Sequence, residues 1–211
     1  MSSPQPKPAG KPRSIRPLIL LALVCLAPLV FALLAYYVPS LGLRPAENTN
    51  YGAILEPQRP MPDSSKLQLT TLEGEPFDLK SLQGKWLLIS ADQSACPESC
   101  ARKLFILRNS HASQGKNVDR LKRIWFITDD GKVPENVLDA YQGNVFLRAD
   151  PAQLAEFLAP GAGAAEHDAA LRAPMWIIDP LGNLMLEFPA DADPFKVRKD
   201  ISKLLFSSRV G

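Results

Sequence analysis

Residues 18–38 form an apolar run without a charged side chain, and this run constrains the topology of the chain more than any other feature. Its 21 residues, built as a helix with a rise of 1.5 Å per residue, reach about 30 Å, the thickness of a bilayer's hydrocarbon core. Tyr36 and Tyr37 lie at its end, where amphipathic rings favour the membrane interface, and Pro28 is tolerated in a membrane helix. The run predicts one transmembrane helix.

Basic residues are distributed unevenly around this run. Arg44 and Arg59 are the only ones between it and Lys66, whereas four precede it: Lys7, Lys11, Arg13 and Arg16. Because basic flanks stay on the cytoplasmic side, we expect residues 1–17 to form a cytoplasmic tail and the C-terminal part to be periplasmic. This describes a single-pass protein of the inner (plasma) membrane. The alternative, a cleaved signal peptide, usually has an apolar core of only ~7–15 residues and an A-x-A site, which is missing here.

The part of the chain after the apolar run divides into a linker and one domain. Residues 39–66 show neither a helical nor a strand period, so we expect an extended linker. Residues 67–211 suffice for a single domain. The net charge of +2 gives no electrostatic reason to expect a nucleic-acid partner.

The first half of this domain predicts strands followed by a helix. Residues 67–70 and 76–79 indicate two short strands around a turn, and the apolar residues 86–89 indicate a strand buried on both faces. A helix is expected directly afterwards, with Cys96 at its N-cap position and Pro97 in its first turn.

The second half continues the alternation of strands and helices. Residues 160–173 are rich in small side chains and predict a loop. Helices are expected at 134–141, from Asp150 to 158 and from Asp193 to 205, and strands at 124–127, 145–147, 175–178 and 184–186. This order predicts an α/β fold, with a central mixed sheet and helices on both of its faces.

Two of the three cysteines lie together in the predicted domain. Cys25 lies in the apolar run, where it is most simply a small packing residue. Cys96 and Cys100 are separated by Pro-Glu-Ser. An isolated pair four residues apart in an exported domain indicates a disulfide, a metal site or both.

The spacing of the pair favours chemistry over a purely structural bridge. Cysteines at i and i+4 of a helix have Cβ atoms about 6 Å apart, whereas a disulfide requires about 3.8 Å, so closing the bridge requires a distorted first turn. Two thiolates at helical spacing suit Cu(I). A helix N-terminus lowers the pKa of a thiol, so we expect Cys96 to be the nucleophile or the first metal ligand. A structural bridge is the alternative, although a loop of three residues gains little from closure.

Several segments, taken in order, resemble one known family. They are the Cys-Pro-x-x-x-Cys motif at 96–100 after the strand at 86–89, the strand and acidic turn at 124–130, the short helix at 133–141, and the hairpin at 177–183. The chain resembles the thioredoxin superfamily and, within it, the membrane-anchored Sco/SenC branch that helps to assemble cytochrome c oxidase. The resemblance covers about residues 67–206 and implies a thioredoxin-like fold.

The chain departs from this branch at one metal ligand. Copper-binding Sco proteins have a histidine about eight residues before the aspartate of the late hairpin, and counting back from Asp179 places Leu171 there. The nearest histidine is His167, which completes a candidate Cu(I) ligand set with Cys96 and Cys100. The Ala-Pro-Met sequence at 173–175 resembles instead the cis-proline turn of TlpA/ResA-type oxidoreductases, where Met175 is another candidate ligand.

Three functional hypotheses follow, and whether the protein is an enzyme is left open. The first is an assembly factor for cytochrome c oxidase that delivers Cu(I) to an oxidase subunit or keeps its cysteines reduced. The second is a general extracytoplasmic thiol–disulfide oxidoreductase with other exported, cysteine-containing clients. The third is a non-catalytic interaction domain with a vestigial cysteine pair.

Overall fold

The computed structural model describes residues 15–38, 50–208 and 210. The chain divides into two compact units, residues 1–48 and 49–211, which are considered separately. Most of the predicted cytoplasmic tail and the first part of the predicted linker lie outside the described residues.

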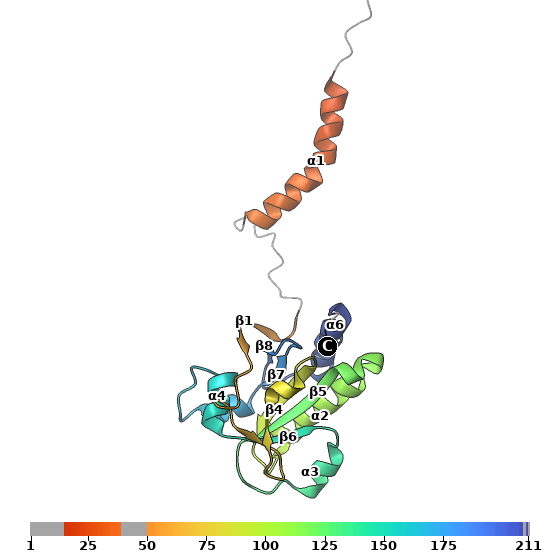
Figure 1. Cartoon of the computed structure of the whole chain (residues 1–211). Helices are drawn as coiled ribbons and strands as arrows, with labels where there is room; N and C mark the ends of the chain where they lie inside the picture. Colours follow the sequence, from red (N-terminus) through yellow and green to blue (C-terminus); the bar gives the residue numbers. More distant parts are fainter. Residues whose placement is uncertain (1–14, 39–49, 209, 211) are drawn as a thin grey trace, which may run out of the picture. The chain divides into compact units, whose positions relative to one another are not determined.

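Helix α1 (Arg16–Tyr37) occupies the predicted apolar run (Figure 1). Among the described residues it is the one helix long and apolar enough to cross a bilayer, with 22 residues and a mean hydropathy of 3.0. None of its residues is buried within the structure. Length and composition therefore support the predicted membrane anchor.

One eight-stranded mixed sheet forms the centre of the second unit, in the order β1-β8-β7-β4-β5-β6-β2-β3. The central strands β4, β5 and β6 are parallel, and the remaining pairs are antiparallel. The strands are β1 (Ala53–Pro60), β2 (Leu69–Thr70), β3 (Pro76–Phe77), β4 (Trp86–Asp92), β5 (Leu121–Ile127), β6 (Val145–Ala149), β7 (Met175–Ile178) and β8 (Asn183–Phe188).

Helices cover both faces of this sheet, as predicted (Figure 1). Buried residues of α4 and α5 belong to one hydrophobic cluster, and those of α2 and α6 belong to a second. The helices are α2 (Glu98–Ala112), α3 (Glu135–Ala140), α4 (Pro151–Leu158), α5 (His167–Arg172) and α6 (Pro194–Ser207), with 3₁₀ turns η2 (Leu79–Leu82) and η3 (Gly115–Arg120).

The central strand β4 separates the two clusters by the alternation of its side chains. Leu87 and Ile89 pack on the α4/α5 side, whereas Trp86 and Leu88 pack on the α2/α6 side. A strand that is apolar on both faces must lie inside the sheet, because successive side chains point to opposite faces. The two-sided burial of residues 86–89 was predicted correctly from the sequence.

The prediction of an extended linker up to residue 66 was wrong for its second part. Residues Ala53–Pro60 form strand β1, which pairs with β8 at the edge of the sheet. Its register shifts between Ile54 and Arg59. Proline lacks a backbone donor and is accepted on an edge strand, so Pro57 and Pro60 do not prevent this pairing.

The predicted loop at 160–173 also contains a helix. Residues His167–Arg172 form α5, and Leu171 on this helix is fully buried in the α4/α5 cluster. Alanine is the best helix former, and burial of Leu171 supplies the tertiary contact that a helix of six residues requires.

Candidate functional site

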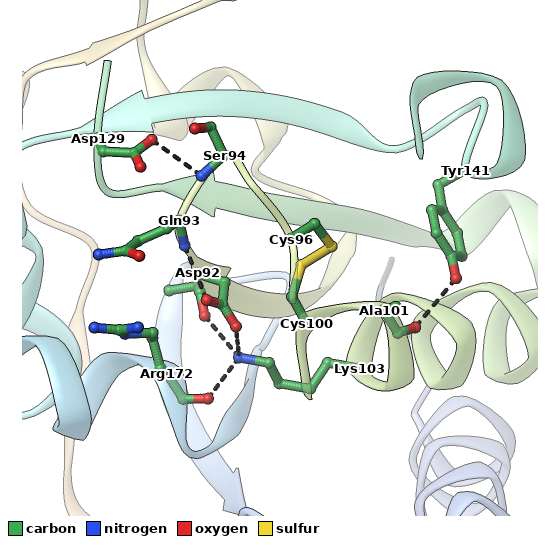
Figure 2. The surroundings of a disulfide bond; sticks show 11 residues. Asp92, Gln93, Ser94, Cys96, Cys100, Ala101, Lys103, Asp129, Tyr141 and Arg172 are labelled. Carbon is green, nitrogen blue, oxygen red and sulfur yellow. Dashed lines mark hydrogen bonds and ion pairs between the residues drawn. A yellow bond between two sulfur atoms is a disulfide. The ribbon is translucent and has the colours of Figure 1, made fainter. Parts of the chain in front are cut away.

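The cysteine pair lies where β4 ends and α2 begins (Figure 2). β4 ends at Asp92, a short loop follows, and Cys96 and Cys100 form a disulfide with a Cα–Cα distance of 5.0 Å. The loop leaves the carboxyl end of the central parallel strands, the usual edge for functional groups in an α/β sheet.

Cys96 lies just outside helix α2 rather than at its N-cap. The N-cap residue is Pro97, the helix begins at Glu98, and Cys96 has a left-handed backbone with φ of 44°. A non-glycine residue in this region costs about 1–2 kcal/mol. The predicted distortion around the first turn is therefore present, because Cys96 leaves the helical conformation that would hold the sulfurs apart.

The two cysteine residues differ in their exposure to solvent. Cys100 is only 1% exposed and belongs to the α2/α6 cluster, whereas Cys96 is half-buried at the edge of that cluster. Cys96 is therefore the more accessible residue of the two. This asymmetry agrees with the predicted role of Cys96 as the reactive member of the pair.

An acidic turn after β5 holds the loop that leads to Cys96. The Ser94 backbone N–H donates to Asp129 Oδ1 at 3.0 Å (Figure 2). The Gly131 N–H donates to the same oxygen at 3.3 Å. Burial alone would raise the pKa of Asp129, but hydrogen bonds from Ser94 and Gly131 and the nearby Arg148 guanidinium together lower it. Asp129 therefore anchors the loop as a carboxylate.

A buried ion pair lies beside the disulfide. Lys103 Nζ lies 3.1 Å from Asp92 Oδ2, and it also donates to the carbonyls of Ala91 at 2.7 Å and Arg172 at 2.6 Å (Figure 2). Burial lowers the pKa of Lys103, and the Asp92 carboxylate opposes that shift. Lys103 follows Cys100 by three residues, so the two side chains share the buried face of α2.

The pairing of Lys103 with Asp92 was not predicted from the sequence. Lys103 could be recognised as a cation near the cysteines and Asp92 as a nearby anion. A lysine in the same helical phase as Cys100, Leu104 and Leu107 is the signal that could have indicated burial.

His167 lies apart from the cysteine pair. Among the described residues, no group of three or more His, Cys, Asp or Glu side chains is arranged to hold a metal ion. His167 lies apart from the cysteines because of the direction of α5. The last residue of this helix, Arg172, contacts Lys103 near the disulfide, whereas His167 is the first residue. His167 lines a surface pocket together with residues of α4.

Met175 and the segment before it do not form the predicted cis-proline turn. Within the described ranges, the one cis peptide bond precedes Pro57, so the bond before Pro174 is trans. The chain enters β7 directly from α5, with Ala173 still in helical conformation. Met175 is 1% exposed and packs in the same cluster as Cys100, as a core residue.

Fold and site together define a thioredoxin-like protein with a disulfide at the start of helix α2. The profile of the family described as "Transmembrane-like, thioredoxin-like, C-terminal domain" matches residues 86–208, and the chain belongs to that family. A search of the curated proteins found no match.

Solved Sco structures share this fold. Apo Sco1 from Thermus thermophilus is 21% identical over 75% of this chain and 99% of its own, with a TM-score of 0.53. Copper-bound yeast Sco1 is 18% identical over 73% and 96%, with a TM-score of 0.53. BsSco, a cytochrome c oxidase assembly protein of the Sco family with a disulfide switch, is 13% identical over 74% and 99%, with a TM-score of 0.52. The resemblance predicted from the sequence is confirmed for the fold.

Proposed function

We propose that the protein is a membrane-anchored factor for cytochrome c oxidase assembly that acts by thiol–disulfide exchange. The observation that carries this proposal is the disulfide at the start of α2, in which Cys96 is reachable and Cys100 is buried. A solely structural bridge would gain little by closing a loop of three residues.

The exchange begins when a client thiolate attacks Cys96 Sγ along the accessible side of the disulfide. A client–Cys96 bond forms, the Cys96–Cys100 bond breaks, and Cys100 leaves as a thiolate that then takes up a proton. A second client thiolate attacks the client sulfur of the mixed disulfide and releases Cys96. The client loses two electrons and the pair gains two. The reverse sequence reduces a client disulfide.

The surroundings of Cys100 favour its role as the leaving group. Cys100 is in the first turn of α2, where unpaired N–H groups and the helix dipole stabilise a negative charge. The Lys103 ammonium on the same helix face adds a buried positive charge. A thiolate that is stabilised by nearby positive charge is a better leaving group, so both features favour opening of the disulfide.

The oxidase client is proposed from the likeness in fold. BsSco belongs to a family of cytochrome c oxidase assembly proteins and has a disulfide switch, and this chain, which is similar to it in fold, has a disulfide at the start of α2. We propose a cysteine-containing oxidase subunit as the partner. Another exported protein with paired cysteines is the alternative client, and a non-catalytic interaction domain is the alternative function.

Copper delivery is a second candidate function, supported by the two adjacent sulfurs. Once reduced, Cys96 and Cys100 would offer two soft thiolates to Cu(I), which would be the cargo of the reaction. The similar yeast structure contains copper. Such a site would have the two cysteine sulfurs as its protein ligands. His167 lies at the far end of α5 and Met175 is packed in the core, so neither is placed to be a third ligand.

Membrane anchorage by α1 and a periplasmic folded unit complete the proposal. The helix has the length and hydropathy of a membrane span, and the basic residues before it favour a cytoplasmic N-terminus. Outside the cytoplasm, cysteine pairs can cycle through disulfides.

Trapping of the mixed disulfide tests the proposed function. The full chain carrying Cys25→Ser and Cys100→Ser should form a covalent adduct with an oxidase subunit through Cys96, visible on non-reducing gels. The matched control, Cys25→Ser with Cys96→Ser, should form little adduct, because Cys100 is buried. Cells that contain only the Cys96→Ser/Cys100→Ser chain should lose oxidase activity.

Other outcomes separate the alternatives. Adducts with several unrelated exported proteins, and none with the oxidase, would favour the general oxidoreductase. Full oxidase activity with the double variant would contradict a chemical role for the pair and favour the interaction domain.

A further inference from the structure

Helix α6 exposes two phenylalanines on its solvent side. Phe195 is 62% exposed and Phe206 is 89% exposed. They are eleven residues apart, which is about three turns of 3.6 residues, so both lie on the same face of the helix. Single exposed apolar residues are common, but two aligned aromatic rings at the ends of one helix face indicate a surface that contacts something.

Basic residues surround these two rings. The exposed cations of the helix are Lys196, Arg198, Lys199 and Lys203, and together with Phe195 and Phe206 they form what is called here the α6 surface. Asp200 is the one acidic residue of the helix, and it is buried. Asp191 and Asp193 are exposed but precede the first turn, where Asp193 caps the helix.

The start of the folded unit is attached to this same helix. The backbone N–H groups of Tyr51 and Gly52 donate to Asp200 Oδ2 at 2.7 and 2.9 Å, and the Asp193 N–H donates to the Tyr51 hydroxyl at 3.0 Å. Lys196 Nζ lies 5.1 Å from the centre of the Tyr51 ring. The segment that arrives from the apolar helix is therefore fastened to α6.

The length of the connection keeps α6 within reach of a membrane. Thirteen residues lie between Tyr37 at the end of α1 and Tyr51. Even a fully extended chain of this length covers only about 50 Å. The lipid headgroups of a membrane that holds α1 are therefore present at high local concentration around the α6 surface.

We propose that the α6 surface docks on the anionic phospholipid headgroups of the membrane that holds α1. Lysine and arginine bind anionic headgroups, and phenylalanine inserts at the headgroup–acyl boundary. The inference rests on the membrane anchorage in the proposed function and is independent of the cysteine chemistry.

The start of α6 lies at the end of the sheet that carries the cysteine loop. Phe188 at the end of β8 is paired with Met175, and Met175 is paired with Ser90 near the end of β4. The Tyr51 ring lies 6.3 Å from that of Phe188. The start of α6 and the cysteine loop therefore share one end of the sheet, and α6 runs from there through Leu205, which accepts a hydrogen bond from Arg120 just before β5.

Quenching by brominated lipids tests the proposal in the full chain. The variant Phe206→Trp is reconstituted in vesicles of phosphatidylglycerol and phosphatidylcholine that contain brominated chains. The matched control is Leu181→Trp, since Leu181 is 70% exposed in the turn between β7 and β8 and is not part of the α6 surface. The native tryptophans Trp86, Trp125 and Trp176 are buried and give a constant background. Quenching at position 206 should exceed that at 181 by about twofold or more.

Charge reversal completes the test. The Phe206→Trp chain is also prepared with three charge reversals, Lys196→Glu, Lys199→Glu and Lys203→Glu. These reversals should reduce quenching to the level of the Leu181→Trp control. Vesicles of phosphatidylcholine alone should have the same effect on the Phe206→Trp chain. Circular dichroism verifies that the reversed variant is folded. Equal quenching at both positions in anionic vesicles, or quenching insensitive to lipid charge, would overturn the proposal. Failure of the disulfide-trapping experiment would not affect the proposal that the α6 surface docks on the membrane.

Discussion

Lys103 Nζ and Asp92 Oδ2 lie 3.1 Å apart in a setting where both side chains are almost completely buried. The same ammonium group binds the last carbonyl of α5 and a carbonyl of β4, so it joins three elements beneath the disulfide. A buried ion pair contributes little net stability compared with an apolar pair, but removing one partner leaves an unpaired charge. Lys103 therefore links helix α2, which carries Cys100, to strand β4 and helix α5.

Replacing Lys103 by methionine is expected to destabilise the folded unit by about 3–5 kcal/mol, because Asp92 is left without its counter-ion. Chemical denaturation of the full chain in detergent measures the change. Lys132→Met is the matched control, since its ion pair with Glu135 is exposed, and it should cause no measurable change. The double variant Asp92→Leu/Lys103→Met should lose less stability than Lys103→Met, which would confirm that the two charges are coupled. An equal or greater loss of stability would contradict this coupling.

The two cysteines should differ in reactivity once reduced. In a Cys25→Ser background, Cys96 in the Cys100→Ser chain should react with iodoacetamide about tenfold or more faster than Cys100 in the Cys96→Ser chain. The reason is access, because Cys100 is 1% exposed and Cys96 is half-buried. Mass spectrometry of timed samples gives both rates. Equal rates would show that the assigned roles are wrong.

Gly131 is expected to tolerate no side chain. A Cβ at this position would overlap Ser94 Oγ and lie 3.3 Å from Ser94 Cβ, and Ser94 is 3% exposed with little room to move. Gly131→Ala should cost about 1–3 kcal/mol and alter the alkylation rate of reduced Cys96, whose loop is held by Ser94 and Asp129. Denaturation and alkylation measure these effects.

Two variants control for the effect of an added methyl group at Gly131. Gly163→Ala meets nothing within 4 Å and should be neutral. Removing the hydroxyl by Ser94→Ala should relieve the overlap, so the double variant Ser94→Ala/Gly131→Ala should lose less stability than the sum of the two single variants. Additive losses would show that Ser94 and Gly131 are not in contact.

The predicted topology can be tested with reporters fused after Gly211. Alkaline phosphatase should be active there and a cytoplasmic reporter inactive, because the four basic residues before the apolar helix favour a cytoplasmic N-terminus. Replacing Lys7, Lys11, Arg13 and Arg16 by uncharged residues should reduce the phosphatase signal. A phosphatase fusion that is inactive beside an active cytoplasmic reporter would reverse the assigned orientation.

Local signals in the sequence predicted most of the elements. Asp150 and Asp193, each followed by proline, cap α4 and α6 through hydrogen bonds to the first backbone N–H groups. The apolar runs that become β4 and β5 identified the centre of the sheet, since only strands buried on both faces are continuously apolar. These features depend on residues that are close in the sequence.

Features that depend on distant partners were missed. Strand β1 contains charged residues and two prolines, and it is a strand because it pairs with β8 more than 120 residues later. Helix α5 is stabilised by burial of Leu171. The position of His167 depends on the direction of α5, which the long-range contact between Lys103 and Arg172 shows. Spacing in the sequence could not place that histidine relative to the cysteines.

Any Cu(I) site should depend on the two sulfurs and little on histidine. The usual histidine position holds Leu171, which is buried, and His167 lies at the other end of the same helix. For His167 to reach the cysteines, α5 would have to unfold and withdraw Leu171 from the core. Refixing the chain in a new conformation costs about 1–2 kcal/mol per residue, before the lost burial is included.

We therefore expect His167→Ala to weaken Cu(I) binding by less than about tenfold, and Cys96→Ser to abolish tight binding, because a single thiolate is a poor Cu(I) site. Anaerobic titration of the reduced full chain against a competing Cu(I) chelator measures both, in a Cys25→Ser background. His111→Ala is the matched control, as His111 lies in the last turn of α2, away from the pair at its start. A loss of about a hundredfold or more for His167→Ala would identify it as the third ligand and require α5 to rearrange. Absence of Cu(I) binding by the parent chain would remove copper delivery and leave thiol–disulfide exchange as the chemistry of the pair.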